Sequence, residues 1–325
     1  MTTQQIFDLA IKMGIKADLR GLEKVKKYLA RLNKKYEAMS AAEKKDFDAE
    51  KLSNPFSDTR VLVDTERNAV KKILAGIDMK GSELLLADKL GIDLVIGHHP
   101  EGKALADLSG VMDLQAEVLA QYGVPINIAE SVIRPRISEV SRGISPINHN
   151  RDVDLARMLK LDYMCVHTAA DNLGASFMVG VLDKSQPETV GEVMEMLREI
   201  PEYREAIKYG AGPKIFVGSP DSSCGRIAVT EFTGGTSGSK DMYEKMAQAG
   251  IGTIIGMHMS EDHRKEAEKS HVNVVIAGHM SSDSLGMNLF LDELEKRGLE
   301  VIPVSGLIRV KRFKKKLIHP RTFYS

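Results

Sequence analysis

Hydrophobic residues recur at helical spacing in the first part of the chain, inside a highly charged segment. This spacing predicts two or three amphipathic helices over residues 1–57. The Asn54-Pro55 pair marks the end of this helical extension, because a proline disfavours the helical conformation of the residue before it. The apolar positions that recur are Leu22, Val25, Tyr28, Leu29 and Leu32.

From Thr59 onward, short β-branched runs alternate with helical patterns. This alternation is typical of a parallel or mixed sheet covered by helices, and it predicts an α/β fold. The predicted strands are 61–63, 94–96, 126–128, 164–166, 177–181, 215–217, 227–229, 253–255, 272–276 and 300–304.

One segment of the chain occurs twice. Residues 91–99 match residues 250–258 in register, and a predicted helix that opens near a Gly-Ser pair precedes each copy. Such a repeat indicates one βα unit used twice, and hence two similar lobes. The expected organisation is a helical extension over 1–57, a first lobe over 58–184, a connecting segment over 185–225, a second lobe over 226–308 and a basic tail over 309–325.

Composition and charge narrow the function classes. The chain carries 45 Lys and Arg against 45 Asp and Glu, so its formal net charge is zero and gives no long-range attraction to a polyanion such as DNA. A hydrophobic content of 43% is that of a folded globular chain. Two cysteines are too few for a disulfide framework, and no signal peptide or stretch of about 18 apolar residues is visible. These features predict a cytoplasmic protein with no membrane contact.

Histidine follows four of the predicted strands. Ligands of open α/β sheets bind beyond the carboxyl ends of strands, so these side chains can converge on one site. A single histidine at a strand end is commonly incidental, whereas recurrence at four ends favours a common site. The residues are the adjacent pair His98 and His99, then His167, His258 and His279.

Two of these histidines share the spacing His-x-x-x-Asp. His167 precedes Asp171 and His279 precedes Asp283, so each pair offers an imidazole and a carboxylate within about one turn of backbone. That donor set suits zinc, iron or manganese, and the adjacent histidine pair could serve two neighbouring ions. Structural roles are the alternative. Asp283 could favour the start of a helix that reaches about residue 297, and Asp171 could close an Asx turn.

The run Gly234-Gly235-Thr236-Ser237-Gly238 opens a glycine-rich stretch that leads to Lys240. It departs from a P-loop, because Ser239 takes the place of the second glycine and Asp241 follows the lysine. Two interpretations stay open. The run is either an anion-binding turn at the amide end of a helix or a plain turn.

The C-terminal segment is basic. Such a run is usually a solvated surface, and contact with nucleic acid or an acidic neighbouring subunit is the alternative. We do not expect nucleic-acid binding, because no aromatic residues or known binding motif accompany the cations. The cations are Arg309, Lys311, Arg312, Lys314, Lys315 and Lys316.

Four motifs, in this order, resemble those of the GTP cyclohydrolase type 2-like family, also called the NGG-one-interacting factor three family. The similarity covers roughly residues 59–305. It implies an α/β protein with two similar lobes, a toroidal homohexamer and a dinuclear metal site between the lobes. The motifs are Leu94-Val95-Ile96-Gly97-His98-His99-Pro100, His167-Thr168-Ala169-Ala170-Asp171, Gly234-Gly235-Thr236-Ser237-Gly238 and Ala277-Gly278-His279-Met280-Ser281-Ser282-Asp283.

The resemblance also implies roles for single residues. His167 matches a family histidine close to the metals that is not one of the usual ligands, and we expect it to act as a general acid or base. Asp283 stands where the family usually has glutamate. The family's second-lobe histidine segment corresponds only loosely to residues 258–263. The implied metal ligands are His98, His99, Asp171, His279 and Asp283.

Two functional hypotheses follow. The first is a dinuclear metal-dependent hydrolase or cyclohydrolase that acts on an anionic small molecule, either nucleotide-like or phosphorylated, with two zinc, iron or manganese ions as cofactors. The second is a non-catalytic metal-binding scaffold or regulatory protein with partner or nucleic-acid contacts. The GTP cyclohydrolase name comes from the family alone, since no guanine-reading pattern is visible in the sequence.

Overall fold

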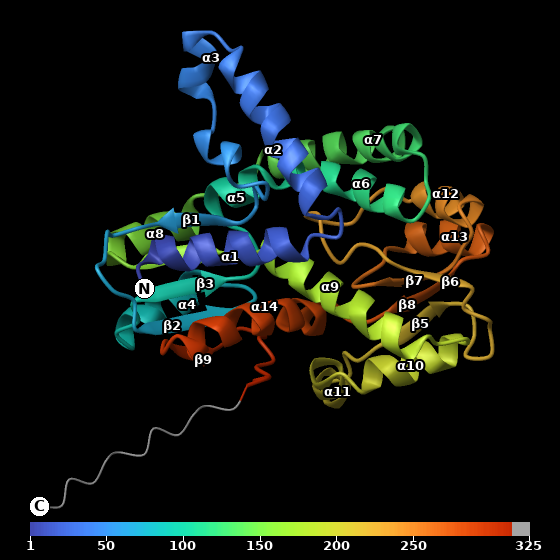
Figure 1. Cartoon of the computed structure of the whole chain (residues 1–325). Helices are drawn as coiled ribbons and strands as arrows, with labels where there is room; N and C mark the ends of the chain where they lie inside the picture. The colour runs from blue at the N-terminus through green and yellow to red at the C-terminus, as the bar shows by residue number, and fades with distance from the viewer. Residues whose placement is uncertain (314–325) are drawn as a thin grey trace, which may run out of the picture.

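The computed structural model describes residues 1–313, which form two β-sheets with helices around and between them (Figure 1). The first sheet has the strand order β1-β4-β3-β2-β9, and the second has the order β5-β8-β7-β6. The first contains β1 (Arg60–Val63), β2 (Lys72–Gly76), β3 (Leu94–Gly97), β4 (Asp162–Cys165) and β9 (Glu300–Pro303). The second contains β5 (Lys214–Val217), β6 (Arg226–Val229), β7 (Ile251–Gly256) and β8 (Asn273–Ile276).

The two sheets are built alike. In each, an antiparallel edge strand, β1 or β5, pairs with the first of several parallel strands. The two copies of the sequence repeat hold the same place, because β3 lies between β4 and β2 and β7 lies between β8 and β6. The predicted α/β fold with two similar lobes is therefore confirmed. β9 adds a fifth strand beside β2 in the first sheet, although its residues fall in the range 226–308 expected for the second lobe.

Two of the predicted strands are helical. Residues 126–128 begin α7 (Ile126–Ile144), and residues 177–181 lie within α9 (Thr168–Ser185). The buried positions of α7 fall on one helical face, and Met178 of α9 packs in the same apolar cluster as Val229 and Ile255 of the second sheet, so tertiary packing outweighs the local β preference of these short apolar runs. Strand β2 was not among the predicted strands, although most of its residues are buried.

Helices cover both sheets and connect them. None of the helices in the described part of the chain is long and apolar enough to cross a membrane. Besides α7 and α9, the described helices are α1 (Thr3–Ala17), α2 (Leu22–Glu37), α3 (Ala41–Asp46), η1 (Ala49–Leu52), α4 (Gly81–Lys89), α5 (Gly102–Ala106), η2 (Leu108–Val111), α6 (Asp113–Gln121), α8 (Arg151–Leu159), α10 (Val190–Arg198), α11 (Pro201–Lys208), α12 (Met242–Gln248), α13 (Glu261–Lys269) and α14 (His279–Lys296).

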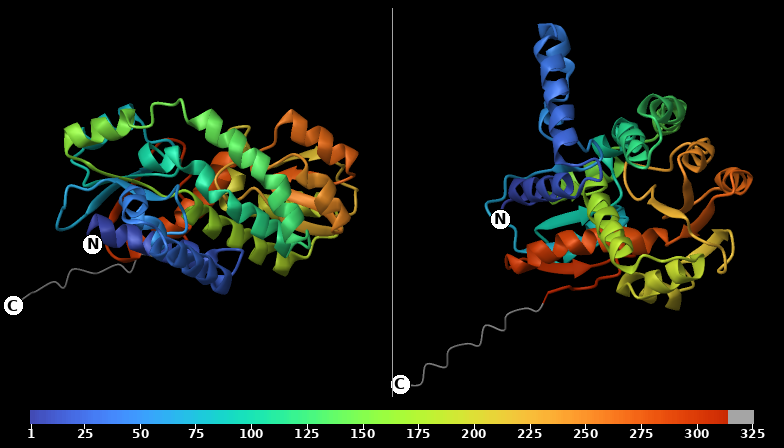
Figure 2. Two further views of the ribbon diagram at one scale, coloured as in Figure 1. Left: turned by 90° about the horizontal axis from the view of Figure 1, so that it is seen from above. Right: turned by 45° about the vertical axis from the view of Figure 1, so that its right-hand side comes forward.

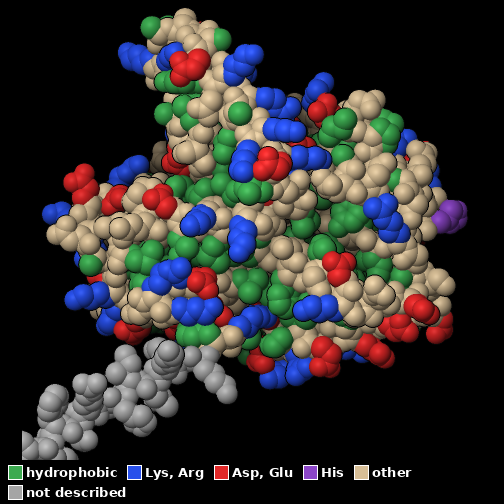
Figure 3. Space-filling model, viewed as in Figure 1, with side chains coloured by type: hydrophobic (Ala, Val, Ile, Leu, Met, Phe, Trp, Pro, Cys, Tyr) green, Lys and Arg blue, Asp and Glu red, His purple; other side chains and the backbone are tan. Residues whose placement is uncertain are grey.

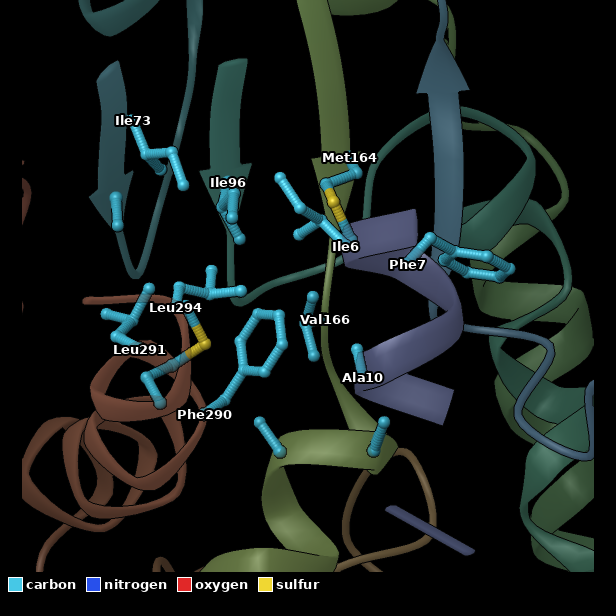
Figure 4. Packing of buried hydrophobic residues seen from close by; sticks show 14 of the residues in the cluster. Ile6, Phe7, Ala10, Ile73, Ile96, Met164, Val166, Phe290, Leu291 and Leu294 are labelled. Atoms are coloured by element: carbon cyan, nitrogen blue, oxygen red, sulfur yellow. The ribbon is translucent and has the colours of Figure 1, made fainter. Parts of the chain in front are cut away.

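The helix α1 belongs to the core of the first lobe. Ile6, Phe7 and Ala10 of α1 pack in the same apolar cluster as Phe290 of α14, on one face of the first sheet (Figure 4). By contrast, α2 and α3 project from the body as an arm (Figure 1), and Val25 is the only buried residue of α2. The expected helical extension thus consists of one packed helix and a projecting arm.

The basic segment after β9 is ion-paired within the chain. Arg309 lies 2.6 Å from Asp292, and Arg312 lies 2.6 Å from Glu202. Lys311 contacts a further glutamate of α14 at 2.8 Å. These partners correct the solvated-surface interpretation for the two arginines, because burial beside carboxylates outweighs their hydration. The three remaining cations lie outside the described residues: Lys314, Lys315 and Lys316.

Helices α9 and α14 cross closely between the two lobes (Figure 2). A methyl group on Gly286 would lie 2.3 Å from the carbonyl oxygen of Ala170, so only a residue without a side chain allows this approach. A methyl group on Gly174, across the crossing, would lie 3.6 Å from the backbone nitrogen of Gly286. The crossing brings the N-terminal turns of the two helices together.

The substitution Gly286→Ala is expected to lower the free energy of unfolding by about 1–3 kcal/mol, because the added methyl group overpacks the crossing. Denaturant unfolding followed by circular dichroism measures this change. Gly180→Ala in α9 is the matched control, since no described atom lies within 4 Å of a methyl group added there. The control should be neutral or stabilising by up to about 1 kcal/mol. Equal effects of the two substitutions would contradict the close crossing.

Candidate metal centre

Four strand ends bring histidines of both lobes together. His98 and His99 follow β3, and His167 is the N-cap of α9 after β4. His279 begins α14 after β8, and His258 follows β7. These five side chains form a histidine row. Its neighbouring ring centroids lie 4.9 Å apart for His167 and His98, 5.4 Å for His98 and His99, 5.3 Å for His99 and His279, and 4.9 Å for His279 and His258.

Asp171 and Asp283 lie near the N-termini of α9 and α14 and face this row. The Nε2 atom of His98 is 3.3 Å from Asp171 Oδ1 and 3.5 Å from Asp283 Oδ1. The other oxygen of Asp283, Oδ2, lies 3.4 Å from His99 Nε2 and 3.6 Å from His279 Nε2. Asp283 therefore contacts histidines from both lobes.

The structural alternatives for the two carboxylates are wrong. Because α14 begins at His279, Asp283 lies inside the helix and not at its start. Asp171 lies in the first turn of α9, within regular helix, and closes no Asx turn. Both oxygens of Asp283 are buried without a hydrogen bond from any described residue. Nothing in the fold itself accounts for the burial of that carboxylate.

Hydrogen bonds to Nδ1 orient the three histidines of the first lobe. A proton on Nδ1 leaves Nε2 free to face the cluster, which is the arrangement that metal-binding histidines need. The Nδ1 partners are the Val166 carbonyl oxygen at 3.0 Å for His98, Asp78 Oδ1 at 2.8 Å for His99 and Asp58 Oδ2 at 2.8 Å for His167.

No motif in the sequence identifies Asp58 and Asp78 as members of the site. Asp58 lies 109 residues before His167, and no motif or spacing connects the two. Asp78 follows the end of β2, the strand that the pattern of the sequence does not predict. Assignment of β2 would have placed Asp78 among the polar residues at strand ends.

Carboxylates and imidazoles balance each other's charge in the cluster. Burial disfavours a proton on His98, but Asp283 and Asp171 outweigh it and raise the pKa of His98 well above its ordinary value of 6.5. Burial also opposes ionisation of Asp283, yet His98 and its neighbours hold the pKa of that carboxyl far below its usual range. For His279, burial prevails and lowers the pKa. Without metal, a proton on His98 is thus the counter-charge to the carboxylates at neutral pH.

The donor atoms of the cluster fit a metal ion. His98 Nε2 and both oxygens of Asp283 are buried without a hydrogen-bond partner among the described residues, which is costly unless an ion or water satisfies them. Imidazole nitrogens with carboxylate oxygens suit zinc, iron or manganese. Three groups keep their ligand atoms within 4.8 Å of one another: His98 with His99 and His167, His99 with His279 and Asp283, and His98 with Asp171 and Asp283.

The glycine-rich loop 234–238 lies beside the histidine row. Ser237 Oγ is 2.9 Å from Nδ1 of His258. The backbone N–H of Gly238 donates to Glu231 at 2.9 Å, and the side chain of Gln115 donates to two loop carbonyl oxygens. These bonds fix the loop as a turn, and Ser237 connects it to the second-lobe end of the row.

A cavity of about 560 Å³ borders the loop on the side of α7 and α13. Arg136 and Lys240 in its wall pair with Glu139 at 2.9 Å and with Asp262 at 3.4 Å. Arg142 also lines the cavity, and its guanidinium bonds to a serine hydroxyl. Cations therefore surround the loop on this side, accompanied by carboxylates.

Comparison with known proteins supports the family resemblance. The chain is similar to the crystal structure of a NIF3 superfamily protein from Sphaerobacter thermophilus, with 25% identity over 94% of this chain and 99% of that one and a TM-score of 0.76. It shares its fold with reduced HcgD from Methanocaldococcus jannaschii, at 17% identity over 82% of this chain and 97% of that one and a TM-score of 0.51. No family model and no curated protein matches the chain.

Fold and side-chain cluster together define a two-lobed α/β protein with a buried His/Asp group that could bind metal ions. NIF3 stands for NGG-one-interacting factor three, the family that the sequence motifs resemble. The similarity to a NIF3 superfamily structure supports that resemblance.

The stability of the metal-free protein is expected to fall as the pH rises above about 6.5, the ordinary pKa of histidine. The raised pKa of His98 means that its proton stabilises the folded state. This contribution is complete below the unfolded-state pKa and is lost as the pH passes the higher folded-state pKa. Thermal unfolding of chelator-treated protein across this range measures the effect.

His98→Gln should make this pH dependence shallower, because it removes one of the two imidazoles, His98 and His167, whose pKa is raised in the folded chain. The control is His271→Asn, which changes an exposed histidine outside the row at a position of positive φ that asparagine tolerates. An unaltered slope in His98→Gln would contradict the assignment of the proton.

Proposed function

We propose that this chain is a metal-dependent hydrolase or cyclohydrolase that acts on an anionic small molecule, either nucleotide-like or phosphorylated. The observation that carries the proposal is the set of buried atoms without hydrogen bonds, His98 Nε2 and both oxygens of Asp283. Similar atoms at a purely structural site would be paired, because an unsatisfied buried polar group is costly. His98 follows the strand β3 of the first lobe and Asp283 lies in the helix after β8 of the second lobe, and this position beyond the strand ends supports a site built for a ligand.

The proposed centre holds two divalent ions, with zinc, iron or manganese as the candidates. Bound ions of this kind lower the pKa of water and stabilise the charge that develops during hydrolysis. Their proposed ligands are His98, His99, Asp171, His279 and Asp283, all within the cluster described above.

His167 is the proposed general acid or base. Its Nδ1 atom is held by Asp58 at 2.8 Å, which leaves Nε2 to face the cluster 4.0 Å from Asp171 Oδ2. Burial opposes a proton on His167, but Asp171 and Asp58 outweigh it and raise the pKa of this imidazole. His167 can therefore hold a proton near neutral pH and give it to a leaving group, as general acid catalysis requires.

The loop 234–238 is the proposed binding site for the anionic part of the substrate. Ser237 lies next to the histidine row through His258, and Arg136, Arg142 and Lys240 line the cavity on its other side. Cations and hydroxyl groups in one place favour a phosphate group.

A non-catalytic role has one observation in its favour. The projecting arm carries Lys and Arg side chains along α2, and cations are also visible over its base in Figure 3. A scaffold or regulatory protein could use this arm to contact an acidic partner or nucleic acid. Salt-sensitive binding of an oligonucleotide, with no turnover of any substrate, would favour this alternative. The exposed cations of α2 are Lys24, Lys26, Lys27, Arg31, Lys34 and Lys35.

The metal content should depend on residues of the cluster. Asp171→Ala and His279→Ala are each expected to remove at least half of the metal that the purified protein binds, because each deletes a proposed ligand. Elemental analysis after dialysis measures metal per chain, and circular dichroism checks that the variants fold. His271→Asn is again the control and should bind as much metal as the unsubstituted chain. Unchanged metal content in both cluster variants would refute the centre.

Turnover should depend on both the metal and His167. We expect the metal-loaded protein to hydrolyse at least one compound in a panel of nucleoside triphosphates and phosphodiesters, and a chelator to abolish that activity. His167→Ala should lower kcat by about 10²–10⁴-fold while metal content stays unchanged, since His167 is proposed to transfer protons and not to hold the ions. An unchanged kcat would remove His167 from the mechanism.

The toroidal homohexamer that the resemblance implies stays a prediction. Sedimentation equilibrium would test it, with six times the chain mass of 35.8 kDa as the expected result.

A further inference from the structure

A second cavity borders His279, and none of its wall residues belongs to the loop 234–238. Its volume is about 740 Å³, within the range of pockets that hold small organic molecules. The walls come from α11, from the first turn of α14 and from the segment 304–309 that follows β9. His279 lies in the cavity wall and also belongs to the histidine row, so a molecule in the cavity would reach the cluster directly.

The walls of this cavity are mainly apolar. Met280, Leu307 and Ile308 form one side, and Tyr209 is 75% exposed at another. A large aromatic side chain with this exposure offers a flat face to a ligand. The wall therefore favours an uncharged and flat group.

The two ionic side chains in the wall besides His279 are already paired. Arg309 is bound to Asp292 at 2.6 Å, and Glu205 is bound to Lys208 at 2.5 Å. Neither pair leaves a cation for a phosphate group. The cavity beside the loop 234–238 has three cations in its wall, and one of them, Arg142, bonds to a serine hydroxyl and not to a carboxylate.

We propose that this cavity binds an uncharged aromatic ring of the substrate, which stacks on Tyr209 and extends toward His279. The placement of the reacting group at the cluster rests on the proposed function, whereas binding of the ring rests on the cavity alone. The two binding regions then lie at two neighbouring histidines of the row, His258 and His279. The loop 234–238, whose Ser237 contacts His258, binds the anionic end of the substrate. The cavity at Tyr209 binds its aromatic ring.

Indole is a suitable probe, because it is small, aromatic and uncharged. In saturation-transfer NMR, the metal-free protein is expected to transfer magnetisation to indole. Tyr209→Ser should weaken indole binding about fivefold or more through loss of the aromatic face. Ala211→Phe should abolish it, because Ala211 is an exposed residue of the cavity wall and the larger side chain fills the space.

Ile207→Ser is the matched control. Ile207 lies on α11, two residues before Tyr209, and is 44% exposed, but it is not part of the cavity wall, so indole binding should not change. Equal binding to Ala211→Phe and the unsubstituted protein would overturn the proposal. So would displacement of indole by inorganic phosphate, which would show that the cavity prefers an anion.

Relaxation measurements with Mn²⁺ locate the probe relative to the cluster. In protein loaded with Mn²⁺, the indole protons should relax faster than in the metal-free protein, and Ala211→Phe should remove the difference. Indole binding without faster relaxation would overturn the placement beside His279. Failure of the unsubstituted protein to bind any Mn²⁺, zinc or iron would refute the proposed metal centre instead, and saturation transfer would still report on the cavity.

Discussion

The close contact of α9 and α14 is the constraint on which the candidate site depends. Each helix begins directly behind a parallel strand of its own sheet, and each carries a histidine at its start and an aspartate one turn later. Because Gly286 lies against the Ala170 carbonyl, the two N-terminal turns approach until Asp171 and Asp283 both face His98, at 3.3 and 3.5 Å. A larger separation of the helices would leave two half-sites, each with too few donors to enclose an ion.

Much of the fold and of the histidine row could be predicted from the sequence. The repeat over residues 91–99 and 250–258 indicates the two lobes, since identical spacing of apolar and glycine residues builds the same βα unit. Histidines that end parallel strands must lie at one edge of each sheet, so their convergence also follows from local pattern. The sequence does not indicate how the edges of two different sheets face each other, because that depends on the helix crossing at Gly286.

The carboxylates that orient the histidines or pair with the basic segment could not be predicted, because they arrive through tertiary contacts between distant segments. Asp58 reaches His167 only after β1 pairs with β4, and no periodicity connects these residues. The same holds for Arg309 and Arg312, which look like a free basic run in the sequence but meet carboxylates when the segment folds back along α14. Short apolar runs misled the strand assignment in α7 and α9 for a related reason, since burial through tertiary packing is not visible locally.

The two lobes contribute unequally to the centre, although their strands are equivalent. At the position of His98 the second lobe has Met257, which packs in an apolar cluster with Ile255. At the position of His99 it has His258, whose Nδ1 bonds to Ser237 of the loop. The duplicated βα unit therefore supplies possible metal-binding nitrogen atoms in the first lobe. In the second lobe it supplies a hydrogen bond to the loop 234–238.

This asymmetry also affects the charge of the cluster. His98, which has no counterpart in the second lobe, lies between both carboxylates and is the group whose pKa they raise. A proton on its Nε2 atom would offset part of their charge, although both oxygens of Asp283 are still buried without a hydrogen bond from any described residue. A metal ion would need that same nitrogen atom deprotonated, so proton and metal compete for one site. His98 is thus the residue at which protonation would oppose the binding of a metal ion.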